Sequence, residues 1–151
     1  MIRAVLDTSV LVSSVLVPEG IPARVVDAWR ANRFVLVTSP SILAELHTTL
    51  AYPRIRKKYA ITDEIVDRLL ALLAMEAELT SWEPDVSRAR IRDPKDEMVL
   101  ACAVAGRATF VVSGDQDLLT LRAYGDIRMV TAREFLAHLE AEPPPSLPDE
   151  T

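Results

Sequence analysis

At positions 2–9 the sequence reads Ile-Arg-Ala-Val-Leu-Asp-Thr-Ser. The first five of these residues are almost continuously apolar, which is typical of a short strand buried on both faces of a parallel sheet. The apolar run stops abruptly at Asp7, Thr8 and Ser9. An acid directly after a buried strand contributes little to packing, so Asp7 is the first candidate for a functional side chain.

Short apolar runs and helical patterns alternate along the rest of the chain. Further strands are predicted at residues 34–37, 109–113 and 127–130. Helices are predicted at residues 22–32, 40–51, 63–75, 94–105 and 132–140, with a short helical turn at 117–119. A short basic segment follows at 54–58, and residues 80–92 are expected to form a strand end and a loop. This alternation predicts an α/β fold with a central, mostly parallel sheet.

Several of the predicted helices carry sequence signals for their starts and their buried faces. Ser39 before Pro40, Thr62 before two acids, and Thr131 are expected to cap helices. The helix after Thr62 is expected to bury a stripe of Ile65, Leu69, Leu72, Leu73 and Met75. The helix at residues 94–105 is apolar almost all round, which predicts deep burial and makes Cys102, the only cysteine, a small core residue.

The length and charge of the chain limit its class. A chain of 151 residues predicts one domain, here expected at residues 1–140, followed by a disordered proline-rich tail at 141–151. A net charge of −5 argues against a protein that coats nucleic acid, but not against a nuclease with an acidic metal site. No apolar stretch reaches membrane-spanning length, and the first residues lack the pattern of a signal peptide. The expected location is the cytoplasm.

Further acids lie where the predicted fold can bring them to Asp7. Asp115 follows the strand at 109–113, Asp93 and Asp96 begin the buried helix, and Glu45 lies in the second turn of the helix at 40–51. Ligands of open α/β sheets bind beyond the carboxyl ends of the strands. Hard cations such as Mg²⁺ and Mn²⁺ prefer oxygen ligands, and a pair of such ions about 4 Å apart can activate water at a phosphodiester.

Each of these acids also has an alternative explanation. Asp93 is a good helix cap, Asp96 stands where first-turn acids are common, and Asp115 can cap the turn at 117–119. Asp117 can be a first-turn acid there, and Glu45 can be a solvated surface residue. No single acid decides between a structural and a functional role.

Five stretches in order along residues 1–140 resemble PIN domains, and in particular the VapC-like toxins of toxin–antitoxin pairs. They are Val-Leu-Asp-Thr-Ser-Val-Leu at 5–11, the Ser-Pro…Glu-Leu helix at 39–50, Asp-Pro-Lys-Asp…Ala…Ala at 93–103, Val-Val-Ser-Gly-Asp-Gln-Asp-Leu-Leu at 111–119, and residues 127–136, which end in Glu-Phe-Leu. The resemblance implies a three-layer α/β/α PIN-like fold and cleavage of RNA that depends on Mg²⁺ or Mn²⁺.

The resemblance also assigns roles to individual residues. It places Asp7, Glu45, Asp96 and Asp115 in a catalytic quartet, of which Asp7, Asp96 and Asp115 would hold the metal and Glu45 would complete the site or orient the attacking water. Four more residues would support them: Ser9, Asp93, Ser113 and Asp117. Many family members have Asn at the position of Ser9 and Thr at that of Ser113. Both departures keep a small polar side chain.

RNA binding requires cations beside the acids. Arg88, Arg90 and Arg92 precede Asp93 and are favoured for this role over the basic segment 54–58, although solvated surface charge explains either group equally well. Trp29 and Trp82 are expected in the core or at an interface rather than stacked on bases. His47 and His138 lack acid or cysteine partners at ligand spacing and are expected at the surface.

Rival functions are less well supported by the sequence. Four glycines cannot supply a dinucleotide-binding loop, a receiver domain would need a lysine beyond Lys95, and a haloacid-dehalogenase-type phosphatase would need an acid at Ser9. A housekeeping RNA-processing nuclease and a non-catalytic RNA- or protein-binding module remain alternatives. The resemblance further implies an antitoxin partner and a homodimer, and a small neighbouring gene for a DNA-binding antitoxin would favour the toxin.

Overall fold

The protein is described from a computed structural model, which defines residues 1–141. The strands are β1 (Arg3–Leu6), β2 (Val35–Thr38), β3 (Glu78–Leu79), β4 (Phe110–Val112), β5 (Ala123–Tyr124) and β6 (Ile127–Val130). The helices are α1 (Thr8–Leu16), α2 (Ile21–Arg30), α3 (Pro40–Leu50), α4 (Pro53–Tyr59), α5 (Asp63–Glu76), α6 (Pro94–Ala105), α7 (Gln116–Leu119) and α8 (Ala132–Ala141), with a 3₁₀ turn at Ser87–Ala89. The predicted disordered tail lies, from residue 142 on, outside the described residues.

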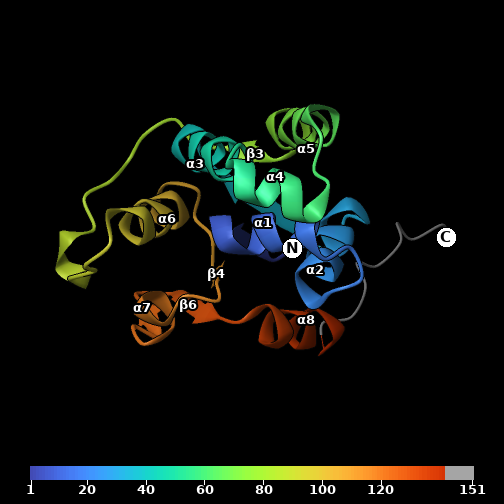
Figure 1. Ribbon diagram of the computed structural model, residues 1–151. Coiled ribbons are helices and arrows are strands. Elements are labelled where there is room, and N and C mark those ends of the chain that lie inside the picture. Colours follow the sequence, from blue (N-terminus) through green and yellow to red (C-terminus); the bar gives the residue numbers. More distant parts are fainter. Residues whose placement is uncertain (142–151) are drawn as a thin grey trace, which may run out of the picture.

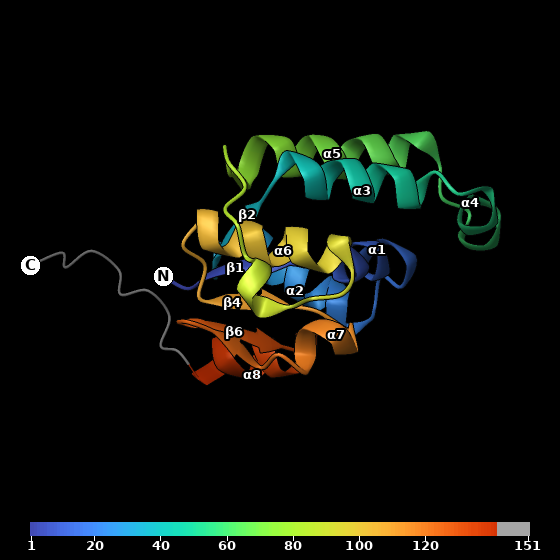
Figure 2. The ribbon, with the colours of Figure 1, turned by 90° about the vertical axis from the view of Figure 1, so that its left-hand side faces the viewer.

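The six strands form one sheet in the order β3-β2-β1-β4-β6-β5. All neighbouring pairs are parallel except β5 and β6. Helix α6 lies on one face of the sheet, while α2 and α8 lie together on the other (Figures 1 and 2). The expected three-layer α/β/α arrangement with a mostly parallel sheet is therefore confirmed.

The register of the central strands decides where the site forms. Leu6 of β1 pairs with Val112 of β4, so Asp7 and Ser113, the residues that follow, lie beside each other at the carboxyl edge of the sheet. The backbone N–H of Asp7 donates to the carbonyl of Val112 over 2.9 Å. Helix α6 packs against β1, β2 and β4, and its first turn lies at the same edge.

The core contains the strands and the inner faces of the helices, as the apolar runs predicted. Phe34 and Phe135 meet edge to face with ring centroids 4.9 Å apart, which joins the start of β2 to α8. Cys102 and Trp29 are buried as expected, and burial raises the pKa of the Cys102 thiol to about 11. His47 is exposed, and the half-buried His138 ring packs 5.0 Å from that of Phe110.

Some local features were missed or predicted wrongly. No element was predicted at the basic segment 54–58, but it is helical, because Pro53 opens α4, a helix that has no buried residue and hence no apolar periodicity. In α5 the predicted stripe is right for the buried Leu73 and for Leu69 and Leu72, which pack against the core. It is wrong for Ile65, which is 39% exposed, and Met75, which is 82% exposed, and it missed the buried Val66. Trp82 is 60% exposed, which excludes the core, so of its two predicted positions the interface stays a prediction. The two-residue strands β3 and β5 are too short to leave a pattern.

Three helix starts confirm their predicted caps. The Ser39 hydroxyl accepts a hydrogen bond from the backbone N–H of Ile42, and the Thr62 hydroxyl accepts one from Ile65. Thr131 and Glu134 cap α8 reciprocally, each side chain accepting from the backbone N–H of the other.

Among residues 1–141, no single helix is long and apolar enough to cross a membrane; α1 and α2 satisfy those criteria only as a pair that meets at a bend of 100°.

Candidate active site

Asp7 is buried at the carboxyl edge of the sheet and is held by two serines. Its Oδ2 accepts hydrogen bonds from Ser113 Oγ at 2.6 Å and from Ser9 Oγ at 3.1 Å. Asp7 also stands at the N-cap position of α1, yet its side chain makes no capping hydrogen bond. The carboxylate is therefore directed to the serines instead of the helix backbone, although only 6% of the residue is exposed.

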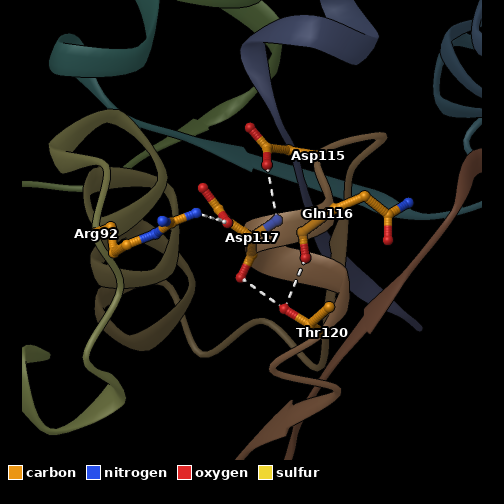
Figure 3. Close-up of polar contacts among 5 residues, drawn as sticks. All are labelled: Arg92, Asp115, Gln116, Asp117 and Thr120. Atoms are coloured by element: carbon orange, nitrogen blue, oxygen red, sulfur yellow. Dashed lines mark hydrogen bonds and ion pairs between the residues drawn. The ribbon is translucent and has the colours of Figure 1, made fainter.

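Ser113 connects Asp7 to the next acid along the edge. While its hydroxyl donates to Asp7, the same oxygen accepts the backbone N–H of Asp115 at 2.9 Å. Asp115 Oδ1 in turn accepts the backbone N–H of Asp117 at 2.8 Å, which caps α7 (Figure 3). Asp115 therefore has the predicted capping role, and its second carboxylate oxygen is left for other partners.

Asp96 enters the same site from the first turn of α6. The residue is 4% exposed, and its Oδ2 has no hydrogen-bond partner among the described residues. Burial, followed by the charges of Asp115, Asp7 and Asp93, raises the pKa of Asp96 to about 7. A buried carboxylate oxygen without a donor is costly, so this position is not explained by packing or capping.

Three carboxylates converge closely enough to share a cation. Ligand oxygens of Asp96, Asp115 and Asp117 all lie within 4.8 Å of one another. The sequence predicted Asp7, Asp96 and Asp115 as the ligands and Asp117 as a support, so this group differs from the predicted set by one member. Asp7 and Asp96 both line one cavity, which is described below, and the negative charge of Asp7 helps to raise the pKa of Asp96.

Glu45 lines the cavity from α3. Its Oε1 lies 3.0 Å from Lys95 Nζ and 3.3 Å from Thr49 Oγ1. This ion pair raises the pKa of Lys95 and links α3 to the start of α6. The cavity between these elements measures about 370 Å³ and is lined by Asp7, Thr8, Ser9, Val12, Ser13, Glu45, Thr49, Asp93, Lys95, Asp96 and Asp115. The predicted quartet is thus gathered in one hollow.

The predicted supporting residues divide into two groups. Ser9 and Ser113 bond Asp7 as described. Asp93 acts as the helix cap, since its Oδ1 accepts the backbone N–H of Lys95 at 2.9 Å. Asp117 pairs with Arg92 at 3.0 Å (Figure 3), which joins the segment before α6 to α7. Lys95 and Thr49 were missed by the sequence analysis, although Lys95 stands inside the Asp-Pro-Lys-Asp stretch.

Of the three arginines predicted to bind RNA, the structure places only Arg92 in contact with the acidic residues. Arg88 and Arg90 are exposed at and after the 3₁₀ turn. Among the described residues, no hydrogen bond or ion pair joins either of them to the carboxylates of the cavity.

The side chains gathered here can be compared with the ligands of a divalent cation. The oxygens that lie closest together belong to carboxylates, which are the hard ligands that Mg²⁺ and Mn²⁺ prefer. The unpartnered Oδ2 of Asp96 points to a missing positive partner, because like charges this close would otherwise hold a proton. The residues therefore fit a divalent cation in this cavity.

Comparison with known proteins gives a family match and a relative of similar length. A family model described as the PIN domain matches residues 3–117, which is more than half of the chain. An uncharacterized protein of Methanocaldococcus jannaschii, MJ1680, is 28% identical over 147 residues, and the match covers 92% of each chain.

Solved structures share the fold at low sequence identity. PAE2754 from Pyrobaculum aerophilum superposes with a TM-score of 0.60 at 16% identity, covering 93% of this chain and 91% of that one. VapBC2 from Rickettsia felis, solved bound to a DNA fragment from its promoter, gives a TM-score of 0.57 at 13% identity and covers 85% and 97%. FitAcB from Neisseria gonorrhoeae gives 0.53 at 17% identity and covers 86% and 98%.

Proposed function

Because the chain belongs to the PIN domain family, we propose that it is a divalent-metal-dependent endoribonuclease that acts as the toxin of a toxin–antitoxin pair. PIN domains are generally nucleases. The observation that carries the proposal is the buried Oδ2 of Asp96, which has no partner among the described residues although Asp96 lines a cavity together with other acids. A protein that used these acids only for stability would gain from an amide or a hydroxyl at this position.

The proposed ligands of Mg²⁺ or Mn²⁺ are Asp7, Asp96 and Asp115, and the short spacing to Asp117 adds this residue to the set. When bound, the cation would offset the charge of the phosphodiester and lower the pKa of a water molecule at the site. The loss of repulsion among the acids would favour the ionised form of Asp96.

Other residues of the site position these carboxylates. Ser113 fixes the orientation of Asp7 through its hydroxyl and holds Asp115 through the backbone N–H. Glu45 lies in the same cavity, where its carboxylate can orient the attacking water and accept its proton. Lys95 holds Glu45 at 3.0 Å and is 63% exposed, so it can also meet a phosphate at the mouth of the cavity.

RNA is the proposed substrate, and the cations around the cavity support that choice. Arg92 stands beside Asp117 with 85% of its side chain exposed, so it can contact a phosphate while remaining close to the acids. Arg88 and Arg90 are proposed to extend this binding surface along the incoming strand. The location proposed for this activity is the cytoplasm.

The toxin role rests on the kind of fold that the chain shares. VapBC2 and FitAcB are toxin–antitoxin complexes, and the chain shares their fold over most of its length. We propose that this chain likewise binds a cognate antitoxin and that it assembles as a homodimer. The proposed nuclease unit is residues 1–140, with the proline-rich residues 141–151 outside it.

Cleavage of labelled total RNA tests the nuclease directly. Purified protein is incubated with Mn²⁺, Mg²⁺ or EDTA, beside an Asp7→Asn, Asp96→Asn double variant. Asp67→Asn on α5, which changes an exposed acid away from the cavity, is the matched control. We expect cleavage only with metal, a loss of at least about 100-fold in the double variant, and full activity in the control.

Two results of this assay would count against the proposal. Cleavage that persists in the double variant would mean that the acids do not form the site. A wild-type protein that binds RNA but leaves it intact with either metal would favour a non-catalytic RNA-binding module.

A further inference from the structure

A second hollow lies next to the acidic cavity, on the side of α8. It measures about 520 Å³, which is within the range of about 300–1,000 Å³ typical of ligand pockets. Residues from α1, the start of α2, the segment after β4 and the start of α8 line it. None of the roles described above uses this space.

The two hollows share part of their lining. Ser9, Ser13 and Asp115 line both of them, so Asp115, one of the proposed metal ligands, stands between the two hollows, while Asp7 and Asp96 line the acidic cavity. A polynucleotide whose phosphodiester reaches these acids must place its flanking nucleotides on either side. The second hollow is therefore on the path of a substrate strand.

The lining of the second hollow differs from that of the acidic cavity. Apolar surface comes from Val10, Ile21 and Pro22, while Thr131 and Ser113 contribute hydroxyl groups. One cation, Arg133, lines it as well, and no carboxylate of the described residues forms an ion pair with this guanidinium. An apolar wall beside hydroxyls and one cation suits a base, a ribose and a phosphate, in that order.

We propose that this hollow is a subsite for the nucleotide next to the scissile phosphate of a single-stranded RNA, with Arg133 contacting the phosphate of that nucleotide. The proposal rests on the proposed ribonuclease function. A hollow between helices can receive an unstacked base, whereas the bases of an RNA duplex remain stacked and paired. The subsite accordingly selects unpaired RNA at the point of cleavage.

Two substitutions probe the subsite independently. Arg133→Gln removes the cation, with Arg107→Gln as the matched control, because Arg107 lies after α6 at the opposite, amino-terminal edge of the sheet. Gly114 lines the hollow, and a Cβ placed there meets no atom within 4 Å. The series Gly114→Ala, Gly114→Leu and Gly114→Trp therefore places side chains of increasing size at the wall of the hollow without a clash at Cβ.

The probes are a labelled single-stranded oligoribonucleotide and its non-cleavable 2′-O-methyl counterpart. Binding of the non-cleavable probe is followed by fluorescence anisotropy, and cleavage of the other gives KM and kcat. We expect Arg133→Gln to raise Kd and KM by about fivefold to tenfold with little change in kcat, and Arg107→Gln to change neither. The Gly114 series should weaken binding progressively with side-chain size, while thermal unfolding midpoints stay near that of the wild type.

The outcomes separate this proposal from the nuclease on which it rests. If the wild type cleaves but Arg133→Gln and Gly114→Trp bind and cleave as the wild type does, the subsite is wrong and the nuclease stands. If the wild type binds the probe without cleaving it, the nuclease fails and the anisotropy series alone decides the subsite. If the wild type neither binds nor cleaves single-stranded RNA, both are overturned.

Discussion

At the scale of single residues, Asp96 shows most clearly how the site departs from a structure optimised for stability. The side chain is almost fully buried, one of its oxygens lacks a partner among the described residues, and three other acids act on it. Folding concentrates these negative charges although repulsion and desolvation both oppose it. A bound cation would remove both costs, which ties the strain of the metal-free site to its proposed function.

This strain predicts how metal-free stability depends on pH. Asp96 has a pKa of about 7 in the folded protein, against 3.8 for an aspartate exposed to water, so the native state holds the proton more tightly than the unfolded chain. Ionised Asp96 lowers the free energy of unfolding. This loss of stability is absent at acidic pH, grows as pH rises through the interval between the two pKa values, and is complete above about pH 7. Since one pKa unit corresponds to about 1.4 kcal/mol, it should reach on the order of 2–4 kcal/mol.

Urea unfolding in EDTA at several pH values measures this effect. Asp96→Asn should be as stable as the wild type near about pH 4 and more stable by a margin that grows towards about pH 8. Glu97→Gln, in the same helical turn, is the matched control and should follow the wild-type curve. Parallel curves for Asp96→Asn and the wild type would show that Asp96 is not strained.

The sequence predicted the identity of the acids better than their partners. Asp7, Asp96 and Asp115 could be found because each follows a strand or begins a helix at one edge of the sheet. Arg92 and Lys95 pair with Asp117 and Glu45 across different elements, and such pairing depends on tertiary packing. For the same reason, the sequence could not predict that the carboxylates of Asp96 and Asp117 lie close together in space.

At the scale of elements, the position of α6 decides whether the acids meet. Its end is fixed by Gly106, where an added Cβ would lie 2.2 Å from Val37 Cγ1 of β2. The carbonyl of Gly106 also accepts hydrogen bonds from the Arg3 guanidinium at 3.0 and 2.6 Å, and Arg3 pairs with Glu78 at 2.7 Å. These contacts hold α6, β1, β2 and β3 together at the edge opposite the site.

Gly106→Ala should therefore destabilise the protein by about 1–3 kcal/mol, because overpacking a tight contact forces neighbouring atoms to move. The change is steric, since the φ of −91° at this position suits any residue. Removing the opposing methyl groups with Val37→Ala should recover part of the loss in the double variant. Chemical unfolding of the four proteins in the cycle measures this coupling, and strictly additive losses would contradict the proposed contact.

Prediction of the elements succeeded where burial left a pattern. The buried strands and α6 are apolar over their length, and Ser39, Thr62 and Thr131 mark helix starts by local hydrogen bonding. Helix α4 escaped prediction because it buries nothing, and β3 and β5 are set by pairing with longer strands rather than by their own residues. The exposed Met75 shows that a helical stripe can run past the partner that covers it.

At the scale of the whole molecule, strand order converts distant sequence positions into one site. Strands β1 and β4 are neighbours although more than half of the chain separates them, and α6 crosses them so that its first turn reaches their carboxyl ends (Figure 2). The PIN family membership and the shared fold of the solved relatives fit this arrangement. Two adjoining hollows with unlike linings then give the proposed substrate a path across the acids.

The claim that a divalent cation belongs with Asp96 is tested most directly by calorimetric titration of metal-free protein with Mn²⁺. We predict saturable binding to the wild type and to Glu97→Gln, and an affinity at least about tenfold lower for Asp96→Asn. Equal affinities for the wild type and Asp96→Asn would place the cation elsewhere. An absence of binding to the wild type would contradict the metal site itself.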